Sequence, residues 1–283
     1  MDFTESVVIV THNRPRDCMD TLQSLMRQNV KPFEVIVIED ASSNNLPIIE
    51  DLSSIKILRS QRELGLGQAR SLGSRLAKGS IIAFLDDDAI ADEQWLQEII
   101  EAFKGEVDIV GGLTTPLYLS SIPWWWDDKV LGFLVGVRND CLTDNPLTQV
   151  FGCNFAVKKK VLEDLGYFHP KLGRYKGKQF GGEDTLLLLR ASQEGFKLYF
   201  NKKSVIYHKV SPERLTLRYL LKRAWYSGAS WRLIFGLSLN RLMDYMTLVR
   251  AGRKKKAQSK WSAKITLFTL RFIQMLGYML GYH

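Results

Sequence analysis

The stretch SIIAFLDDDA, residues 80–89, carries the most informative pattern in the chain, because a short apolar run passes directly into three aspartates. Ser80 to Leu85 has the β-branched and apolar composition of a buried strand. Three carboxylates at the end of such a strand repel one another and shift one another's pKa values unless a cation joins them. Their hard oxygen atoms favour Mg²⁺ or Mn²⁺, and either ion can bind a diphosphate. A solvated acidic turn is the alternative for the triplet taken alone.

Similar apolar runs occur on both sides of this stretch, separated by segments with helical periodicity. We expect strands at residues 6–10, 33–38, 55–58, 80–85, 197–200 and 204–207, a further apolar-rich block at 151–157, and helices at 17–28, 67–78 and 185–192. This alternation is typical of an α/β protein with a largely parallel sheet flanked by helices. Ligands bind at the carboxyl ends of the strands in such sheets, and polar or acidic residues follow several of these strands.

The length of the chain and the distribution of its charge indicate one large domain with an extension. The chain has 283 residues, of which 46% are hydrophobic, and this excludes a wholly disordered protein. The net charge of +9 is uneven, since residues 1–208 hold 24 Lys and Arg against 28 Asp and Glu, and residues 209–283 hold 15 against 2. We therefore expect a catalytic domain over residues 1–210 and a helical, basic extension over residues 211–283.

The basic extension predicts an anionic partner, either nucleic acid or a membrane surface. Its cations alternate with Leu, Trp, Tyr, Phe and Met, as in helices that lie in a membrane interface, so we expect an anionic membrane and no nucleic acid. A solvated helical face that packs on the catalytic domain is the competing interpretation. No run of about 18 uninterrupted apolar residues occurs, and the three cysteines form no CxxC pair. The expected location is cytoplasmic, peripheral on the inner face of the cell membrane.

An acidic pair, Glu183 and Asp184, follows Gly181-Gly182 and precedes an apolar helical run. A carboxylate placed there could act as general base for an incoming hydroxyl, although acidic residues also stabilise helix N-termini without any catalytic role. His208 ends the predicted strand SVIYH. A lone histidine beside a strand is more often structural, but one at the end of a strand in an oxygen-rich site could complete a metal shell.

Two further features concern ligand binding. The glycines at positions 65 and 67 suggest a dinucleotide loop, but the third glycine of that pattern would fall at Arg70, so we reject a nicotinamide site and assign Arg70 to a phosphate or base contact. Three consecutive tryptophans, residues 124–126, cannot all face one core. At least one should be exposed and offer a flat surface to sugar rings or lipid head groups.

Seven segments together resemble the family 2 glycosyltransferases, which have the GT-A fold and act with inversion. The segments are VVIVTHNRP (7–15), EVIVIEDASS (34–43), GLGQARSLGSRLAKG (65–79), FLDDDA (84–89), GCNFAVKKKVLEDLGYF (152–168), GGEDTLLLLRASQEGFKLYF (181–200) and VIYH (205–208). They lie in the family's order over about three quarters of the chain. The segment RLTLRYLLKRAWYSGAS resembles the extension of bacterial members that build surface polysaccharides or modify lipid-linked glycans.

The resemblance implies a metal-dependent enzyme that moves a sugar, of hexose type, from a nucleoside-diphosphate donor to a hydroxyl acceptor, with Mg²⁺ or Mn²⁺ as cofactor. It implies donor binding by Thr11, Asn13, Arg14, Asp40, Arg70, Asp86 and Asp87, with Thr11 and Asp40 at the base and Asp86 at the ribose. It implies metal binding by Asp88 and His208, and a catalytic base within the pair Glu183 and Asp184. We also expect a glycan or lipid-linked acceptor to contact Trp124, Trp125, Trp126 and Asn154.

Some positions depart from the family pattern and leave alternatives open. Glu39 stands where the family usually has an aspartate, and the triplet leaves undecided which two of its members contact donor and metal. A sugar-phosphate nucleotidyltransferase is a second enzymatic reading, but it expects a glycine-rich loop after the first strand, and residues 11–15 contain no glycine. A non-catalytic protein that binds nucleic acid or a partner through the basic tail is the third.

Overall fold

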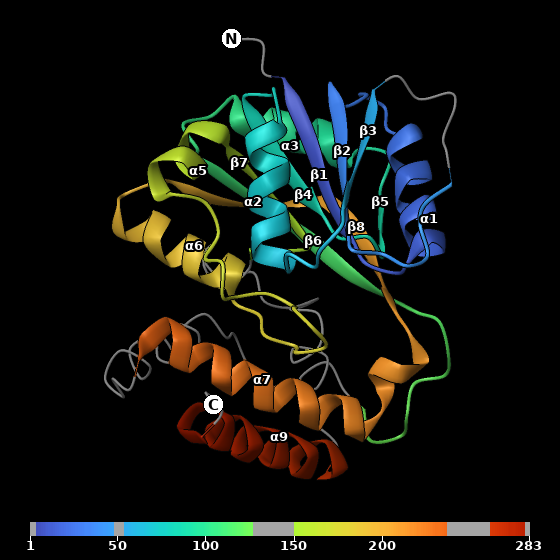
Figure 1. Cartoon of the computed structure of the whole chain (residues 1–283), viewed down its shortest axis with the longest axis vertical. Helices are drawn as coiled ribbons and strands as arrows, with labels where there is room; N and C mark the ends of the chain where they lie inside the picture. Colours follow the sequence, from blue (N-terminus) through green and yellow to red (C-terminus); the bar gives the residue numbers. More distant parts are fainter. Residues whose placement is uncertain (1–3, 48–53, 127–149, 237–260, 281–283) are drawn as a thin grey trace.

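The computed structural model describes residues 4–47, 54–126, 150–236 and 261–280. Its described strands form one eight-stranded sheet in the order β3-β2-β1-β4-β7-β6-β8-β5 (Figure 1). The strands are β1 (Glu5–Thr11), β2 (Glu34–Asp40), β3 (Ile55–Ser60), β4 (Ile81–Leu85), β5 (Ala89–Ala91), β6 (Ile109–Tyr118), β7 (Asn154–Lys158) and β8 (Leu198–Val210). The helices are α1 (Pro15–Met26), α2 (Leu66–Leu76), α3 (Trp95–Phe103), α5 (Lys159–Leu165), α6 (Glu183–Gln193), a 3₁₀ helix (Pro212–Leu215), α7 (Leu217–Phe235) and α9 (Trp261–Leu280).

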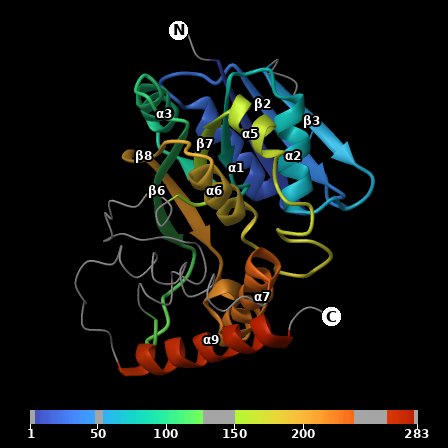
Figure 2. The ribbon, with the colours of Figure 1, turned by 90° about the vertical axis from the view of Figure 1, so that its left-hand side faces the viewer.

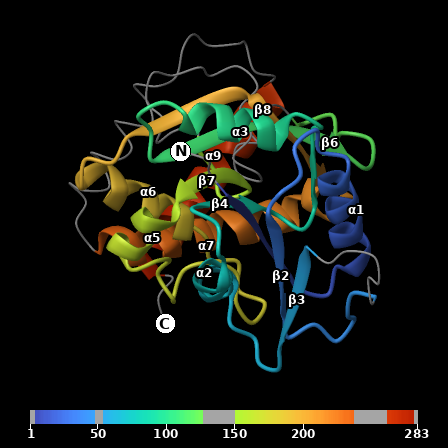
Figure 3. The same cartoon turned by 90° about the horizontal axis from the view of Figure 1, so that it is seen from above.

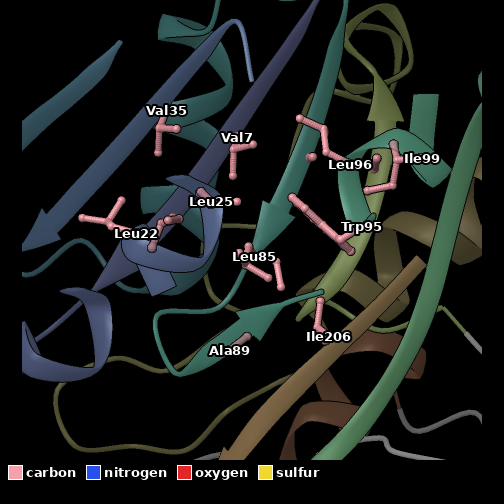
Figure 4. Close-up of a cluster of buried hydrophobic side chains, with 14 of the residues drawn as sticks. Val7, Leu22, Leu25, Val35, Leu85, Ala89, Trp95, Leu96, Ile99 and Ile206 are labelled. Carbon is pink, nitrogen blue, oxygen red and sulfur yellow. The ribbon is translucent and has the colours of Figure 1, made fainter. Parts of the chain in front are cut away.

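The first half of the sheet is parallel and covered by helices on both faces. β1 pairs in parallel with β2 and β4, and β2 with β3. Leu22 of α1 and Trp95 of α3 belong to the cluster on one face, whereas Ala69 of α2 and Leu187 of α6 belong to the cluster on the other (Figures 3 and 4). Burial on both faces explains why β1, β2 and β4 are largely continuous apolar runs and not alternating ones. The predicted α/β fold is confirmed.

The second half of the sheet brings distant segments to the end of β4. β7 pairs antiparallel with both β4 and β6, and β5 pairs antiparallel with β8. The short strand β5 follows the aspartate triplet directly, and Ala89 lies opposite His208. This pairing, which the sequence analysis did not predict, carries the end of β8 to the triplet.

One expectation about the strands was wrong. Residues 197–200 and 204–207 were expected as two strands, but both belong to β8, a single strand that pairs in parallel with β6. Gly112 faces Asn201 while the next residue, Leu113, faces Val205, so β8 accommodates an irregularity between its two halves. Such an irregularity interrupts the apolar pattern without ending the strand.

The expected helical character of the extension is confirmed for its described residues. α7 and α9 lie side by side at one end of the molecule (Figures 1 and 2). Glycines allow their backbones to touch, because a Cβ added at Gly228 would lie 1.9 Å from the carbonyl oxygen of Gln274, and one added at Gly277 would lie 2.1 Å from that of Trp225. None of the described helices combines the length and the apolarity that crossing a membrane requires.

Candidate active site

Two aspartates at the end of β4 lie together with a histidine from β8. His208 Nε2 is 3.3 Å from Asp88 Oδ1 and 3.6 Å from Asp86 Oδ2, and the three residues offer ligand atoms that all lie within 4.8 Å of one another. His208 Nδ1 donates to the carbonyl oxygen of Lys209 at 3.1 Å, so in the neutral tautomer Nε2 presents its lone pair to the carboxylates. Two carboxylates and an imidazole with a free lone pair suit a divalent cation such as Mn²⁺ or Mg²⁺.

Asp87, the middle member of the triplet, has different partners. Its Oδ2 accepts a hydrogen bond from Thr11 Oγ1 at 2.8 Å, and its Oδ1 lies 3.2 Å from Nη1 of Arg14. The same nitrogen of Arg14 is 2.7 Å from Asp88. Burial raises the pKa of Asp87 to about 6, and the charge of Asp88 adds to the rise while that of Arg14 opposes it. Asp86 and Asp88 therefore face the histidine, and Asp87 connects the triplet to the end of β1.

Asn13 and Asp40 join the loops that follow β1 and β2. Asn13 has a left-handed backbone with φ of 56°, and its Oδ1 accepts from the amide nitrogen of Ser43 at 2.7 Å. The buried carboxylate of Asp40 accepts from the amide nitrogens of Leu64 at 2.6 Å and Gly65 at 2.9 Å, immediately before α2. Both residues therefore fix loops at the carboxyl edge of the sheet, close to the acidic triplet.

Glu39, whose role the sequence left open, is a structural residue. Its side chain is buried and accepts from the amide nitrogen of Leu46 and from Nε of Arg59, each at 2.6 Å. A carboxylate that is committed to these two groups fixes the chain beyond β2.

Arg70 connects the candidate cation-binding group, which consists of Asp86, Asp88 and His208, to the acidic pair. Its buried guanidinium donates through Nη1 to Glu183 Oε1 and through Nη2 to Asp86 Oδ1 and the carbonyl oxygen of Gly152, each at 2.8 Å. Charge-assisted hydrogen bonds of this kind are stronger than neutral ones and hold planar groups in fixed orientations. Residues that are more than 100 positions apart in sequence are therefore held in one network.

The two carboxyls that begin α6 differ in exposure and bonding. Glu183 is buried, its Oε2 has no hydrogen-bond partner in the described part of the chain, and burial with the neighbouring Asp184 raises its pKa to about 7. Asp184 is half-buried and accepts from the amide nitrogens of Gly152 at 2.6 Å and Thr185 at 2.7 Å.

The three tryptophans have unequal environments. Trp124 is 75% exposed, Trp125 is half-buried, and Trp126 is buried with its Nε1 donating to the hydroxyl of Tyr118 at 3.1 Å. The expectation that at least one of them is exposed is confirmed. Residues 127–149 lie outside the described residues.

The assignment of Asn154 to acceptor binding was wrong. Asn154 is fully buried; its Nδ2 donates to the carbonyl oxygens of Leu113 and Ser204, and its Oδ1 accepts from Trp95 Nε1 at 2.8 Å. All of its polar groups are thus used to join β7, β6, β8 and α3. The sequence could not show this, because the three partners come from distant segments.

Sequence reasoning missed Arg214, which lies in the 3₁₀ helix after β8. Its buried guanidinium donates through Nη2 to Asp88 Oδ2 at 2.7 Å. The sequence predicts a membrane-facing extension for the basic residues after position 210, yet this arginine contacts the acidic triplet. Arg214 stands six residues after His208, and this short separation is the one feature of the sequence that could have indicated its contact with the triplet.

Comparisons with known proteins agree with this arrangement. The chain has the GT-A fold, and a mannosyltransferase from Pyrobaculum calidifontis, solved with GDP-Man and Mn²⁺, shares this fold with a TM-score of 0.59. The match covers 98% of this chain and 71% of that one at 16% identity. GalNAc-T7, solved with UDP, GalNAc and Mn²⁺, matches with a TM-score of 0.56 and 20% identity over 97% of this chain and 58% of that one.

The family model for glycosyl transferase family 2 matches residues 6–166, so the chain belongs to this family. A glucosyl-dolichyl phosphate glucuronosyltransferase from Haloferax volcanii is 22% identical over 240 residues, which are 81% of this chain and 76% of that protein. The match to the family model includes the aspartate triplet. The acidic pair and His208 lie beyond its last residue, and the fold brings them to the triplet.

Proposed function

We propose that this protein is a metal-dependent, inverting glycosyltransferase that moves a hexose-type sugar from a nucleoside diphosphate to a hydroxyl of a glycan or lipid-linked acceptor. The observation that carries this proposal is the network in which Arg70 joins Asp86 of the cation-binding group to Glu183 of the acidic pair. One group suits the leaving diphosphate, and the other suits the attacking hydroxyl. A single displacement requires both at opposite ends of one sugar.

Asp184 is the group that we assign as general base. It is half-buried, whereas Glu183 is buried and forms an ion pair with Arg70. The Asp184 carboxylate takes the proton of the acceptor hydroxyl as the hydroxyl oxygen forms a bond to the anomeric carbon. The bond from that carbon to the diphosphate breaks, and its electron pair leaves with the diphosphate. Attack opposite to the leaving group inverts the anomeric configuration, by analogy with one-step glycoside hydrolysis.

The residues around the triplet prepare the leaving-group side. A cation held by Asp86, Asp88 and His208 would offset the negative charge that develops on the diphosphate. Thr11 and Arg14 hold Asp87, and Asp40 holds the loop before α2, so these side chains shape the region in which we place the nucleotide. Relatives of this fold support the assignment, since one was solved with GDP-Man and Mn²⁺ and another with UDP and Mn²⁺.

We also infer that residues 211–283 bind the inner surface of an anionic cytoplasmic membrane, where a lipid-linked acceptor would be available. The outer side of α9 exposes Phe268 and Phe272, which are 75% and 56% exposed. Residues 250–264, which lead into and begin this helix, hold seven Lys and Arg and no acidic residue. Cationic segments next to apolar helix faces bind anionic leaflets. The name of the Haloferax volcanii relative also specifies a lipid-linked acceptor.

The test combines a panel of nucleotide sugars with three variants. Donors that bind with Mn²⁺ or Mg²⁺ should raise the melting temperature by mass action. With the donor so identified, Asp184→Asn should lower turnover by about 10²–10⁴-fold, the range for a lost general base, while donor binding persists. Asp88→Asn should weaken metal-dependent donor binding. The surface variant Glu101→Gln, which removes an exposed carboxylate of α3, serves as the control and should match the wild type.

The outcome that contradicts the proposal is equally specific. It fails if no donor of the panel shifts the melting temperature with either metal, or if Asp184→Asn turns over like the wild type. Proton NMR of the first-formed product checks inversion separately, because retention of the anomeric configuration would exclude the one-step mechanism.

A further inference from the structure

Helix α7 lies between α9 and the sheet region (Figures 1 and 2) and contacts residues 179–182, the turn that precedes the acidic pair. Ser230 Oγ accepts from the amide nitrogen of Gly181 at 3.0 Å and donates to the carbonyl oxygen of Tyr226 in its own helix at 2.7 Å. Arg223 Nη1 donates to the carbonyl oxygen of Gln179 at 2.9 Å. Two backbone groups of the turn are thus bound by side chains of α7.

Apolar packing fixes the same turn. The ring of Phe180 makes an edge-to-face contact with Tyr226 of α7, with the ring centroids 5.2 Å apart and the planes at 74°. Gly182 passes so close to α7 that a Cβ added there would lie 2.8 Å from Cδ1 of Ile234. Each of the four residues of the turn is therefore next to α7, either through a backbone group or through a side chain.

Two consecutive glycines give this turn more backbone freedom than other residues would. Gly182 has a φ of 83°, in the left-handed region, and the next two residues, Glu183 and Asp184, begin α6. A rotation about the backbone of Gly181 or Gly182 would move the first turn of α6, and the Asp184 carboxylate with it. The contacts with α7 restrict this rotation.

The Asp184 carboxylate is also limited from its other side. Its Oδ2 accepts from the amide nitrogen of Gly152 at 2.6 Å, and a Cβ added at Gly152 would lie 2.8 Å from the same oxygen. A general base must lie within about 2.6–3.2 Å of the atom whose proton it takes. A displacement of about 1 Å can lower the rate of an enzyme about a hundredfold. The position of the turn therefore bears directly on the reaction proposed above.

We propose that Ser230 and Arg223 of α7 are positioning residues for the sugar transfer, which hold the turn before α6 and thereby place the Asp184 carboxylate against the acceptor hydroxyl. The inference rests on the function proposed above, in which Asp184 is the general base. The positive charge of Arg223 also attracts the carboxylates of Glu183 and Asp184, in agreement with this placement. The first long helix of the extension thus belongs to the catalytic unit.

The experiment compares two serines of α7 that each accept one hydrogen bond. Ser230 accepts from the turn, whereas Ser227 accepts from Nε2 of Gln274 on α9 at 2.7 Å. Ser230→Ala and Ser227→Ala therefore each leave one donor without its acceptor, on opposite sides of the same helix pair. With saturating donor and acceptor, Ser230→Ala should lower kcat about tenfold or more, and Ser227→Ala should keep it within about twofold of the wild type. The Kd for the nucleoside diphosphate with Mn²⁺ should stay within about twofold in both.

Variants of Arg223 test the turn independently, even if Ser230→Ala does not fold. Arg223→Met removes the donor to Gln179 and the charge, whereas Arg223→Lys keeps a donor and the charge. Arg223→Met should lower kcat as Ser230→Ala does, and Arg223→Lys should recover part of the loss. Arg218→Met removes an exposed arginine of the same helix and should match the wild type.

Hydrogen exchange gives a measurement that needs no substrate. The amides of residues 179–185 should exchange about tenfold or more faster in Ser230→Ala than in the wild type, because the turn loses an anchor and opens more often. In Ser227→Ala the same amides should exchange at the wild-type rate.

Two results would overturn the proposal while leaving the proposed function intact. In the first, the amides of residues 179–185 exchange in Ser230→Ala as they do in the wild type, so α7 does not hold the turn. In the second, Ser230→Ala and Ser227→Ala have equal kcat values in a protein whose wild type transfers sugar. A failure of the proposed function is distinct, because the wild type itself would then transfer no sugar from any donor of the panel, and this inference would fall with it.

Discussion

Helix α3 of the sheet region and helix α9 of the extension have a similar spacing of apolar residues, but α3 buries these residues and α9 exposes many of them. α3 buries Trp95, Leu96, Ile99 and Phe103 against the sheet. α9 has apolar residues at the comparable positions Ile265, Phe268, Phe272, Met275 and Met279, and each of these is more than half exposed. Its other face, with Leu270 and Tyr278, is buried toward α7.

This difference shows that amphipathic periodicity predicts a helix but not its partner. In α3 the apolar stripe has a sheet to cover, and in α9 one stripe is covered by α7 while a second remains exposed. Contiguous exposed apolar surface of this kind marks an interaction site. Variants in the two regions test this contrast, and two buried carboxyls of the sheet region provide pH-dependent tests.

The largest effect is expected for the exposed stripe. The double variant Phe268→Ser/Phe272→Ser should lose about a hundredfold in binding to vesicles that contain anionic lipid, because fully burying a large apolar side chain contributes about 1.5–3 kcal/mol. Its unfolding free energy should stay close to the wild-type value, since neither side chain is buried in the protein. Cosedimentation with the vesicles measures binding. The control Leu76→Ser removes a partly exposed apolar residue from α2, in the sheet region.

Equal vesicle binding by the double variant and the wild type would show that the exposed apolar residues of α9 do not bind the membrane. A large loss of stability in the double variant would instead show that the stripe is covered within the protein.

A smaller effect is expected where the two helices of the extension touch. Gly228→Ala places a methyl group 1.9 Å from the carbonyl oxygen of Gln274, so the helices must separate, which should cost about 1–3 kcal/mol of unfolding free energy. Gly105→Ala is the matched control, because its Cβ makes an ordinary contact at 3.4 Å and should change the free energy by less than about 0.5 kcal/mol. Denaturant unfolding compares the two; equal midpoints would mean that α7 and α9 are not closely packed.

A third effect, spread over a range of pH and small at any one pH step, concerns the buried carboxyl at the start of α6. Burial raises the pKa of Glu183 from 4.5 to about 7, so between these values the folded protein holds a proton that the unfolded chain has released. Stability should therefore fall as the pH rises through this window, by at most about 1.4 kcal/mol per pH unit, and the contribution should be constant above it. Glu183→Gln should flatten this part of the curve, as measured by denaturant unfolding at a series of pH values.

Asp87 should also lower the stability of the protein as the pH rises, but over a lower pH range, because burial raises its pKa from 3.8 to about 6. Asp87→Asn should accordingly flatten the curve below about pH 6 and leave the part above it unchanged. Parallel curves for Glu183→Gln and the wild type would contradict the assignment of a buried, protonated Glu183.

Local composition explains the parts that were predicted from the sequence. The strands around residues 6–10, 33–38 and 80–85 are continuous apolar runs, and the structure places strands there. The acidic pair at residues 183–184 begins a helix as expected. The prediction of two separate strands at residues 197–200 and 204–207 was wrong. The irregularity in β8 disrupts the local apolar pattern, while the pairing of β8 with β6 continues.

The sequence by itself determined the residue types at the carboxyl edge of the sheet, because short apolar runs that end in acidic residues can be recognised as strands without any knowledge of packing. Only the tertiary structure decided which of these residues meet. The pairing of β5 with β8 turns Asp86 and Asp88 toward His208, and the 3₁₀ helix after β8 brings Arg214 to Asp88. It also buried Asn154 among three distant partners. Such contacts join residues far apart in the chain, and neither periodicity nor composition records them.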